Sequence, residues 1–237
     1  MQNVSIALKF LTFGVRRRGI PITAEQIGAA APYFPLVGLG LGLVLNIANR
    51  GMEPYLGSET LSVVLVAILV ALTTATHLQG LQKTFDLMRA KPNTSDRTFP
   101  VVGTDGFVAI LFVILLKVRS VEVIGETVGL SLLLTPMFSR WGLVMFMYGS
   151  TSMLDDSTRV VAGHVKTRHM FATSATTLTF AFFLAGRPAL WIGLCISLLA
   201  LLGRYFLRQR HGGITYDNFG AFIEVSEALS FLFFASV

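Results

Sequence analysis

Long apolar runs constrain the fold of this chain more than any other feature. A helix needs about 20 residues to cross a hydrocarbon core of about 30 Å, and seven runs approach that length. They cover residues 29–49, 59–76, 105–124, 127–149, 170–186, 188–207 and 217–237. Hydrophobic residues make up 53% of the 237 residues, whereas charged residues make up 14%. This composition is typical of an integral membrane protein.

The runs lack the alternation of a barrel strand, and lipid offers no partners for backbone groups, so each run is expected to be helical. We therefore predict an all-α integral membrane fold with about seven transmembrane helices. Residues 3–14 are predicted to add an interfacial or re-entrant helix. The connections leave no room for a second soluble domain, so residues 1–237 form one predicted domain. Gly38, Gly40 and Gly42 are expected to permit close helix packing.

Basic residues alternate between the connections. Arg16, Arg17 and Arg18 precede the first run, and further basic residues follow the second, fourth and sixth runs. Cytoplasmic loops of membrane proteins carry an excess of Lys and Arg. The pattern predicts a multi-pass protein of the cell membrane with a cytoplasmic N-terminus and an external C-terminus. It also explains the net charge of +6 without nucleic acid as a partner.

One cluster of polar residues follows the second run, in His77-Leu-Gln-Gly-Leu-Gln-Lys-Thr-Phe-Asp86. If the helix continues there, Gln79, Lys83 and Asp86 share one face, because they are spaced i, i+4 and i+7. Ionisable residues at membrane depth are costly, so such a face indicates a functional site. The alternative is a solvated helix end.

A second cluster lies at the end of the chain, where Asp217, Glu224 and Glu227 share a face of an otherwise apolar helix. Within a membrane these acids require a polar cavity, a metal or a basic partner. The preceding turn, residues 212–215, offers backbone N–H groups and little bulk, which suits the approach of a phosphate. A capped helix start would explain Asp217 but neither glutamate.

Two other charged residues have open interpretations. Arg140, inside the fourth run, either pairs with Glu224 or Glu227 or binds an anionic substrate. Asp105, at the start of the third run, is either a helix cap or a catalytic acid.

Four segments, taken in order, form a pattern along nearly the whole chain. They are Tyr33-Phe-Pro-Leu-Val-Gly38, His77-Leu-x-Gly80-Leu, Ser139-Arg-Trp141 and Gly212-Gly-Ile-Thr-x-Asp217-x-x-Gly-Ala-x-x-Glu224-x-x-Glu227. This pattern resembles cobalamin synthase, the adenosylcobinamide-GDP ribazoletransferase family. The last segment is the most specific of the four.

The resemblance implies a transferase that joins α-ribazole, or its phosphate, to GDP-activated adenosylcobinamide and releases GMP. It also implies Mg²⁺, which would neutralise the phosphates through oxygen ligands. The implied catalytic residues are Asp86, Asp217, Glu224 and Glu227; the implied substrate-binding residues are His77, Gly80, Arg140, Gly212, Gly213 and Thr215; and the implied metal ligands are Asp86, Asp105 and Glu224. The implied partners are the two substrates and the lipid bilayer.

The chain departs from the family pattern, which has acids at the positions of Gln79, Lys83 and Asp86. Two of those three acids are absent, and another acid expected before the third run is missing, with Asp96 or Asp105 as possible replacements. The first hypothesis is an active transferase. The second is a diverged, non-catalytic homologue with a binding or scaffolding role, in which Lys83 takes the place of a metal. An ion-coupled transporter is less favoured, because no inverted repeat is found.

Overall fold

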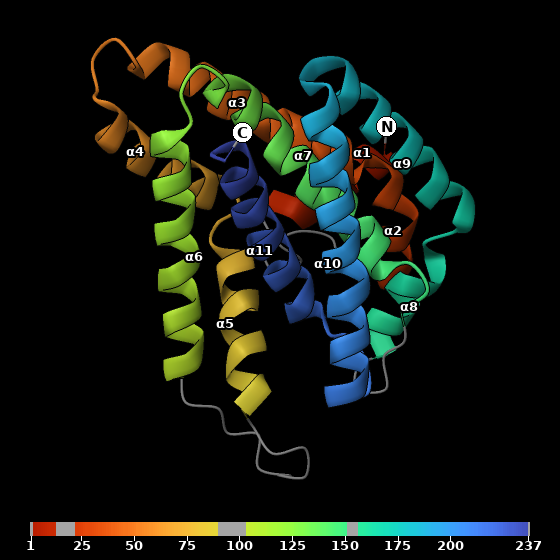
Figure 1. The fold of residues 1–237 in the computed structure, drawn as a ribbon. Coiled ribbons are helices and arrows are strands. Elements are labelled where there is room, and N and C mark those ends of the chain that lie inside the picture. Colours follow the sequence, from red (N-terminus) through yellow and green to blue (C-terminus); the bar gives the residue numbers. More distant parts are fainter. Residues whose placement is uncertain (1, 13–21, 90–102, 151–155, 237) are drawn as a thin grey trace.

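The computed structural model describes residues 2–12, 22–89, 103–150 and 156–236, and the regular secondary structure within them is entirely helical (Figure 1). The helices are α1 (Gln2–Thr12), α2 (Ala24–Ala30), the 3-10 turn η1 (Ala31–Tyr33), α3 (Phe34–Met52), α4 (Ser58–Leu72), α5 (Thr76–Arg89), α6 (Thr104–Val123), α7 (Val128–Met147), α8 (Asp156–His164), α9 (Thr167–Ala185), α10 (Arg187–His211) and α11 (Tyr216–Phe234). Each apolar run falls on helical elements, although the second is divided between α4 and α5, and α1 covers residues 3–12 of the predicted N-terminal helix. The all-α prediction is therefore confirmed.

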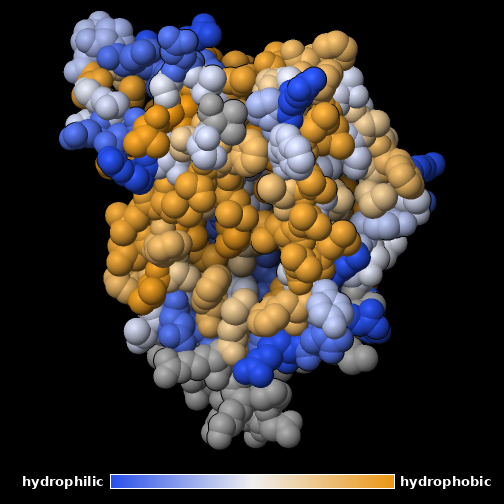
Figure 2. Space-filling view, in the orientation of Figure 1, coloured by the Kyte–Doolittle hydropathy of each residue, from blue (hydrophilic) through white to orange (hydrophobic). Residues whose placement is uncertain are grey.

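Three helical segments of the described chain are long and apolar enough to cross a membrane. They are Ala24–Met52, Val128–Met147 and Arg187–His211, and the bent pair Ser58–Leu72 with Thr76–Met88 would make a fourth span. The predicted count of about seven spans is therefore not confirmed. Figure 2 shows a broad apolar band between hydrophilic regions at the two ends of the molecule, as expected for a protein surrounded by lipid.

The second apolar run does not continue as one helix. A break separates α4 from α5, and the two helices are bent by 87°. Thr74 and Ala75 have φ angles of 49° and 55°, in the left-handed region that residues with a Cβ rarely adopt. The Thr74 hydroxyl donates a hydrogen bond of 3.3 Å to the carbonyl oxygen of Thr12. The end of α1 is thereby tied to the break.

α7 lies in the centre of the bundle and is buried along most of its length. α3 packs closely on it through glycines, because a Cβ on Gly38 would collide with the carbonyl oxygen of Pro136, and one on Gly42 with that of Leu133. These two glycines confirm the predicted close packing. For Gly40 the prediction is wrong, since a Cβ there would have no neighbour within 4 Å.

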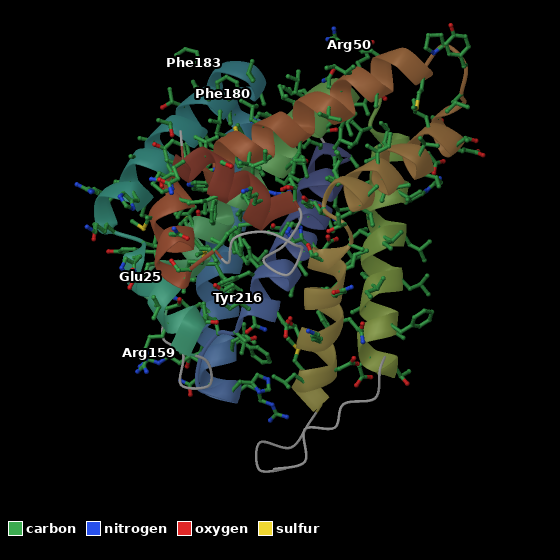
Figure 3. The ribbon with its side chains drawn as sticks, turned by 180° about the vertical axis from the view of Figure 1, so that it is seen from behind. Glu25, Arg50, Arg159, Phe180, Phe183 and Tyr216 are labelled. Atoms are coloured by element: carbon green, nitrogen blue, oxygen red, sulfur yellow. The ribbon has the colours of Figure 1, made fainter. Side chains whose placement is uncertain are left out.

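The bundle has two opposite ends, at which helix termini lie. The C-terminal ends of α5 and α10 and the start of α6 lie at one end of the bundle, and the C-terminus of α11 lies at the other (Figure 1). We call the first the basic end and define it by residues 83–89, 103–106 and 208–217. Figure 3 shows Arg159 toward this end and Arg50 at the opposite one.

Candidate functional site

Two glycines bring the first and last polar segments together where α5 crosses α11. A Cβ on Gly80 would lie 2.5 Å from the carbonyl oxygen of Asp217 and 3.1 Å from the Cα of Gly220. One on Gly220 would lie 2.9 Å from both the Cα and the carbonyl oxygen of His77. Real Cβ atoms do not approach other atoms so closely. Only glycine at these two positions therefore allows the backbones of α5 and α11 to come into direct contact. Gly80, predicted to bind substrate, is thus a packing residue of this crossing.

A polar bridge holds the start of α11 beside the crossing. The Asn218 amide nitrogen donates to the Thr84 hydroxyl at 2.9 Å. The Asn218 amide oxygen accepts from the backbone N–H of Thr215 at 2.7 Å and from its hydroxyl at 3.0 Å. Thr215, a predicted phosphate-binding residue, is therefore the N-cap of α11. Gly212 and Gly213 form the turn before it, with φ angles of 77° and 153° that favour glycine.

An ion pair that water can reach lies on the basic end. The Lys83 Nζ is 3.3 Å from the Asp217 Oδ1, and the two side chains are 51% and 43% exposed. Gln79, one turn before Lys83 on α5, is exposed as well. The pairing of Lys83 with a remaining acid, expected for a diverged homologue, therefore occurs with Asp217.

Asp86 caps a neighbouring helix. Its carboxylate accepts hydrogen bonds from the backbone N–H groups of Gly103 at 3.0 Å and Gly106 at 2.8 Å, and from the Gln82 amide at 3.3 Å. The N-terminus of α6 favours such a negative charge. Asp105 lies in the first turn of the same helix, whereas Asp96 falls outside the described residues.

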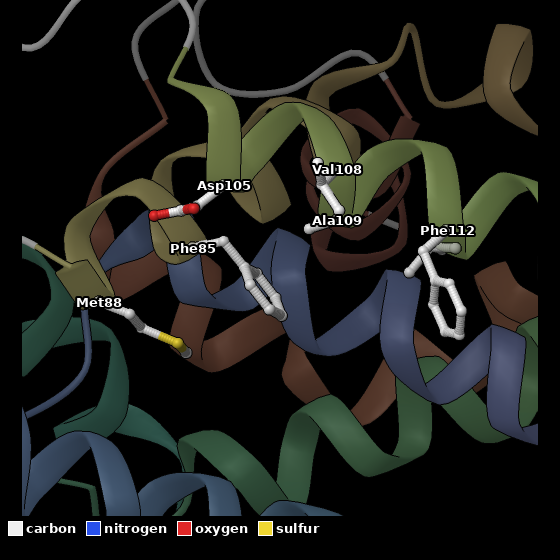
Figure 4. Close-up of a pocket in the computed structure, with 7 residues that line it drawn as sticks. Phe85, Met88, Asp105, Val108, Ala109 and Phe112 are labelled. Carbon is white, nitrogen blue, oxygen red and sulfur yellow. The ribbon is translucent and has the colours of Figure 1, made fainter.

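A cavity of about 550 Å³ opens between α5 and α6 beside these acids (Figure 4). Its lining is mostly apolar and consists of Phe85, Met88, Asp105, Val108, Ala109, Phe112 and Val113. Asp105 is the charged member of this lining, so the cavity suits a largely apolar group.

A second cluster of charges is buried deeper in the bundle. The Lys117 Nζ of α6 lies 2.7 Å from the Glu224 Oε2 and 2.5 Å from the Glu227 Oε2. Arg140 of α7 pairs with the other oxygen of Glu227, which confirms one of its predicted roles. All four side chains are at most 3% exposed. His77 is buried nearby, and its Nδ1 has no partner among the described residues.

Lys117 is the member of this cluster that sequence reasoning missed, because its partners lie more than 100 residues away. A signal was present, since a lysine inside the run Leu-Phe-Val-Ile-Leu-Leu-Lys-Val needs a buried anion.

The basic end and the buried cluster are separate layers. Asp86 lies six residues from Gly80 toward the basic end, and Glu224 lies four residues from Gly220 in the opposite direction. At 1.5 Å per residue, roughly 15 Å of helix separates the two carboxylates, which is too far for one metal ion.

The Mg²⁺ ligand set predicted from Asp86, Asp105 and Glu224 is therefore not brought together. Within the described part of the chain, three or more His, Cys, Asp or Glu side chains nowhere gather as a metal site would require.

Known proteins resemble the chain over nearly its full length. The model of the family described as cobalamin-5-phosphate synthase matches residues 3–235. An adenosylcobinamide-GDP ribazoletransferase of Pseudomonas paraeruginosa is 32% identical, covering 96% of this chain and 95% of its own. One from Thermoanaerobacter sp. (strain X514) is 26% identical, covering 100% and 98%, respectively. No solved structure matches.

Proposed function

The chain belongs to the cobalamin-5-phosphate synthase family, and we propose that it acts as an adenosylcobinamide-GDP ribazoletransferase. The observation that carries this proposal is the match of residues 3–235, together with relatives of that name that align along both chains. The α5–α11 crossing supports it, because it joins two of the four segments on which the resemblance rests, those that begin at His77 and at Gly212.

The reaction exchanges one phosphoryl bond for another. A hydroxyl of α-ribazole, or of its phosphate, attacks the phosphorus that carries the cobinamide arm. A new P–O bond forms, the P–O–P linkage breaks, GMP leaves with the bridging oxygen, and the hydroxyl proton passes to a base. Positioning and charge neutralisation supply most of the catalysis in such transfers.

We assign this chemistry to the basic end. Lys83 is half exposed and offers an ammonium to a phosphate oxygen, and Asp217 beside it is the exposed carboxylate that can accept the proton. Arg208 and Arg210, exposed at the end of α10, add positive charge for a diphosphate. Asp86, which caps α6, positions that helix.

The buried layer has a different part in this proposal. His77, Arg140, Glu224 and Glu227 are all buried, so they act on the reaction through the placement of α5, α7 and α11. Gly212 and Gly213 shape the turn that leads into α11.

The family resemblance also implies Mg²⁺, which would screen the phosphate charges. The described residues do not provide a fitting ligand set, so we assign no step to the metal. Whether the reaction requires Mg²⁺ is testable by chelation with EDTA, followed by titration of Mg²⁺ while GMP release is measured.

The experiment that tests the function uses purified protein, adenosylcobinamide-GDP and α-ribazole. We expect one GMP for each corrinoid product, and no GMP when α-ribazole is omitted. Absence of GMP under conditions in which the Pseudomonas paraeruginosa relative is active would reject the proposal.

The Lys83–Asp217 ion pair favours a second candidate, a non-catalytic homologue that binds the substrates without joining them. In that case the double substitution Gln79→Asp with Lys83→Asp should create Mg²⁺-dependent GMP release. Activity that is the same before and after the substitution would count against this candidate.

We also propose that α3, the bent pair α4–α5, α6, α7, α9, α10 and α11 all cross the cell membrane. The charges on α6 and α11 lower the hydropathy of those helices, but Lys117, Glu224 and Glu227 are paired inside the bundle. Phe112 of α6 and Phe183 of α9 are 66% and 81% exposed, as expected for side chains that face lipid.

The positive-inside pattern supports a cytoplasmic location for the basic end and the N-terminus. Soluble nucleotide substrates would then reach Lys83 and Asp217 from the cytoplasm.

A further inference from the structure

The buried cluster of Lys117, Arg140, Glu224 and Glu227 contains as many cations as anions. Lys117 contacts both glutamates, and Arg140 contacts Glu227. In a region this far from water, an unpaired charge is costly and a matched pair is strongly coupled. Each glutamate is therefore already compensated by the protein.

We propose that Lys117 is a positioning residue that, with Arg140, holds Glu224 and Glu227 as anchors of α11, so that these glutamates do not ligate a metal in this chain. Lys117 comes from α6, Arg140 from α7 and both glutamates from α11. The cluster thus fixes α11 against two helices at once. The position of α11 along its own axis in turn fixes the position of the Thr215–Asp217 segment, which lies about two helical turns from Glu224, at the basic end.

The contacts carry this inference because three of the four glutamate oxygens already accept a hydrogen bond from a cationic side chain. The Lys117 ammonium contacts one oxygen of each glutamate, and the Arg140 guanidinium contacts the second oxygen of Glu227. A divalent ion would have to displace Lys117, leaving its ammonium buried without a partner. The proposal predicts that the stability of the buried cluster depends on equal numbers of positive and negative charges, and not on the presence of any one carboxylate.

The test is a charge-balance cycle made of Lys117→Met, Glu224→Gln and the double variant. Lys117→Met leaves two anions facing one cation, and Glu224→Gln leaves two cations facing one anion. The double variant keeps the balanced Arg140–Glu227 pair. Arg119→Met is the matched control, because Arg119 lies two residues along α6 and its side chain, which pairs with Glu122, is 70% exposed.

Three measurements are made on the full-length protein in detergent: the thermal unfolding midpoint, Mn²⁺ binding by electron paramagnetic resonance with Mn²⁺ alone, and GMP release. We expect both single variants to lower the midpoint and GMP release, the double variant to recover both, and Arg119→Met to change neither. We also expect any Mn²⁺ binding of the unmodified protein to persist in Glu224→Gln.

The inference is overturned if the double variant is no more stable than Lys117→Met, if Lys117→Met is as stable as the unmodified protein, or if Glu224→Gln abolishes Mn²⁺ binding. Recovery of activity separates positioning from ligation, because a lost metal ligand is not restored by removing a lysine. The GMP measurement rests on the proposed function, whereas the midpoint and Mn²⁺ measurements do not. If the unmodified protein releases no GMP, the proposed function fails, but the midpoint and Mn²⁺ measurements still test the inference.

Discussion

Lys83 and Asp217 form an ion pair of the candidate site that water can reach. Their ion pair is about half exposed, and exposed pairs of this kind contribute about 0–1 kcal/mol to stability. We therefore expect Lys83→Met to leave the free energy of unfolding almost unchanged. GMP release should fall strongly, because the substrate diphosphate loses a cation.

Parallel measurement of unfolding and initial rate separates these two effects for Lys83→Met. A large loss of stability would show that the pair is structural. GMP release by Lys83→Met at the rate of the unmodified protein would show that Lys83 does not take part in the reaction.

At the residue scale, sequence reasoning anticipated some of the contacts that the structure shows around the candidate site. It selected Asp217, Glu224 and Glu227 because acids in an apolar helix need partners, and it identified the pairing of Arg140. It did not find Lys117, nor the capping roles of Asp86 and Thr215. These depend on which helices become neighbours in three dimensions, and spacing along one helix does not contain that information.

At the scale of elements, the α5–α11 crossing is the feature on which the site depends most. A methyl group on Gly220 would press against the backbone of His77. We expect Gly220→Ala to cost about 1–3 kcal/mol by forcing the helices apart, and to lower GMP release by displacing Asp217 from Lys83. Unfolding in mixed detergent and denaturant, together with the initial rate, measures both effects.

Gly40→Ala is the control for this substitution. The position is helical and has no neighbour within 4 Å, so the change should be neutral or stabilising by up to about 1 kcal/mol. If both alanine variants behave alike, close approach at the crossing is not what Gly220 provides.

The helices themselves followed from the sequence, because long apolar runs in lipid have no other regular structure available. The break between α4 and α5 did not. Neither glycine nor proline occurs among Thr73, Thr74 and Ala75, and the positive φ angles there are held by tertiary contacts such as the Thr74–Thr12 hydrogen bond. Local sequence patterns do not report such contacts.

At the scale of the whole molecule, the two ends should face opposite sides of the membrane. Cys195 is the chain's single cysteine, so in a Cys195→Ser background each new cysteine is unique. We expect Arg50→Cys to react with an impermeant maleimide on intact cells, and Arg159→Cys to react only after permeabilisation. The reverse result would invert the proposed orientation.

Charge alternation predicted this orientation, but the number of spans remains a prediction at this scale. Apolarity alone identifies three helical segments as spans within the described residues. Some of the charges on α6 and α11, those of Lys117, Glu224 and Glu227, pair inside the bundle, and a hydropathy average cannot distinguish a paired charge from a solvated one.

The central claim is that this chain is a ribazoletransferase whose chemistry takes place at the basic end. The most direct measurement is GMP release from adenosylcobinamide-GDP and α-ribazole by the unmodified protein, by Asp217→Asn and by the surface control Arg119→Met. We predict release by the unmodified protein and the control, and a loss of at least about 100-fold in Asp217→Asn, as for removal of a general base. No release by the unmodified protein, or an undiminished rate in Asp217→Asn, would contradict the account.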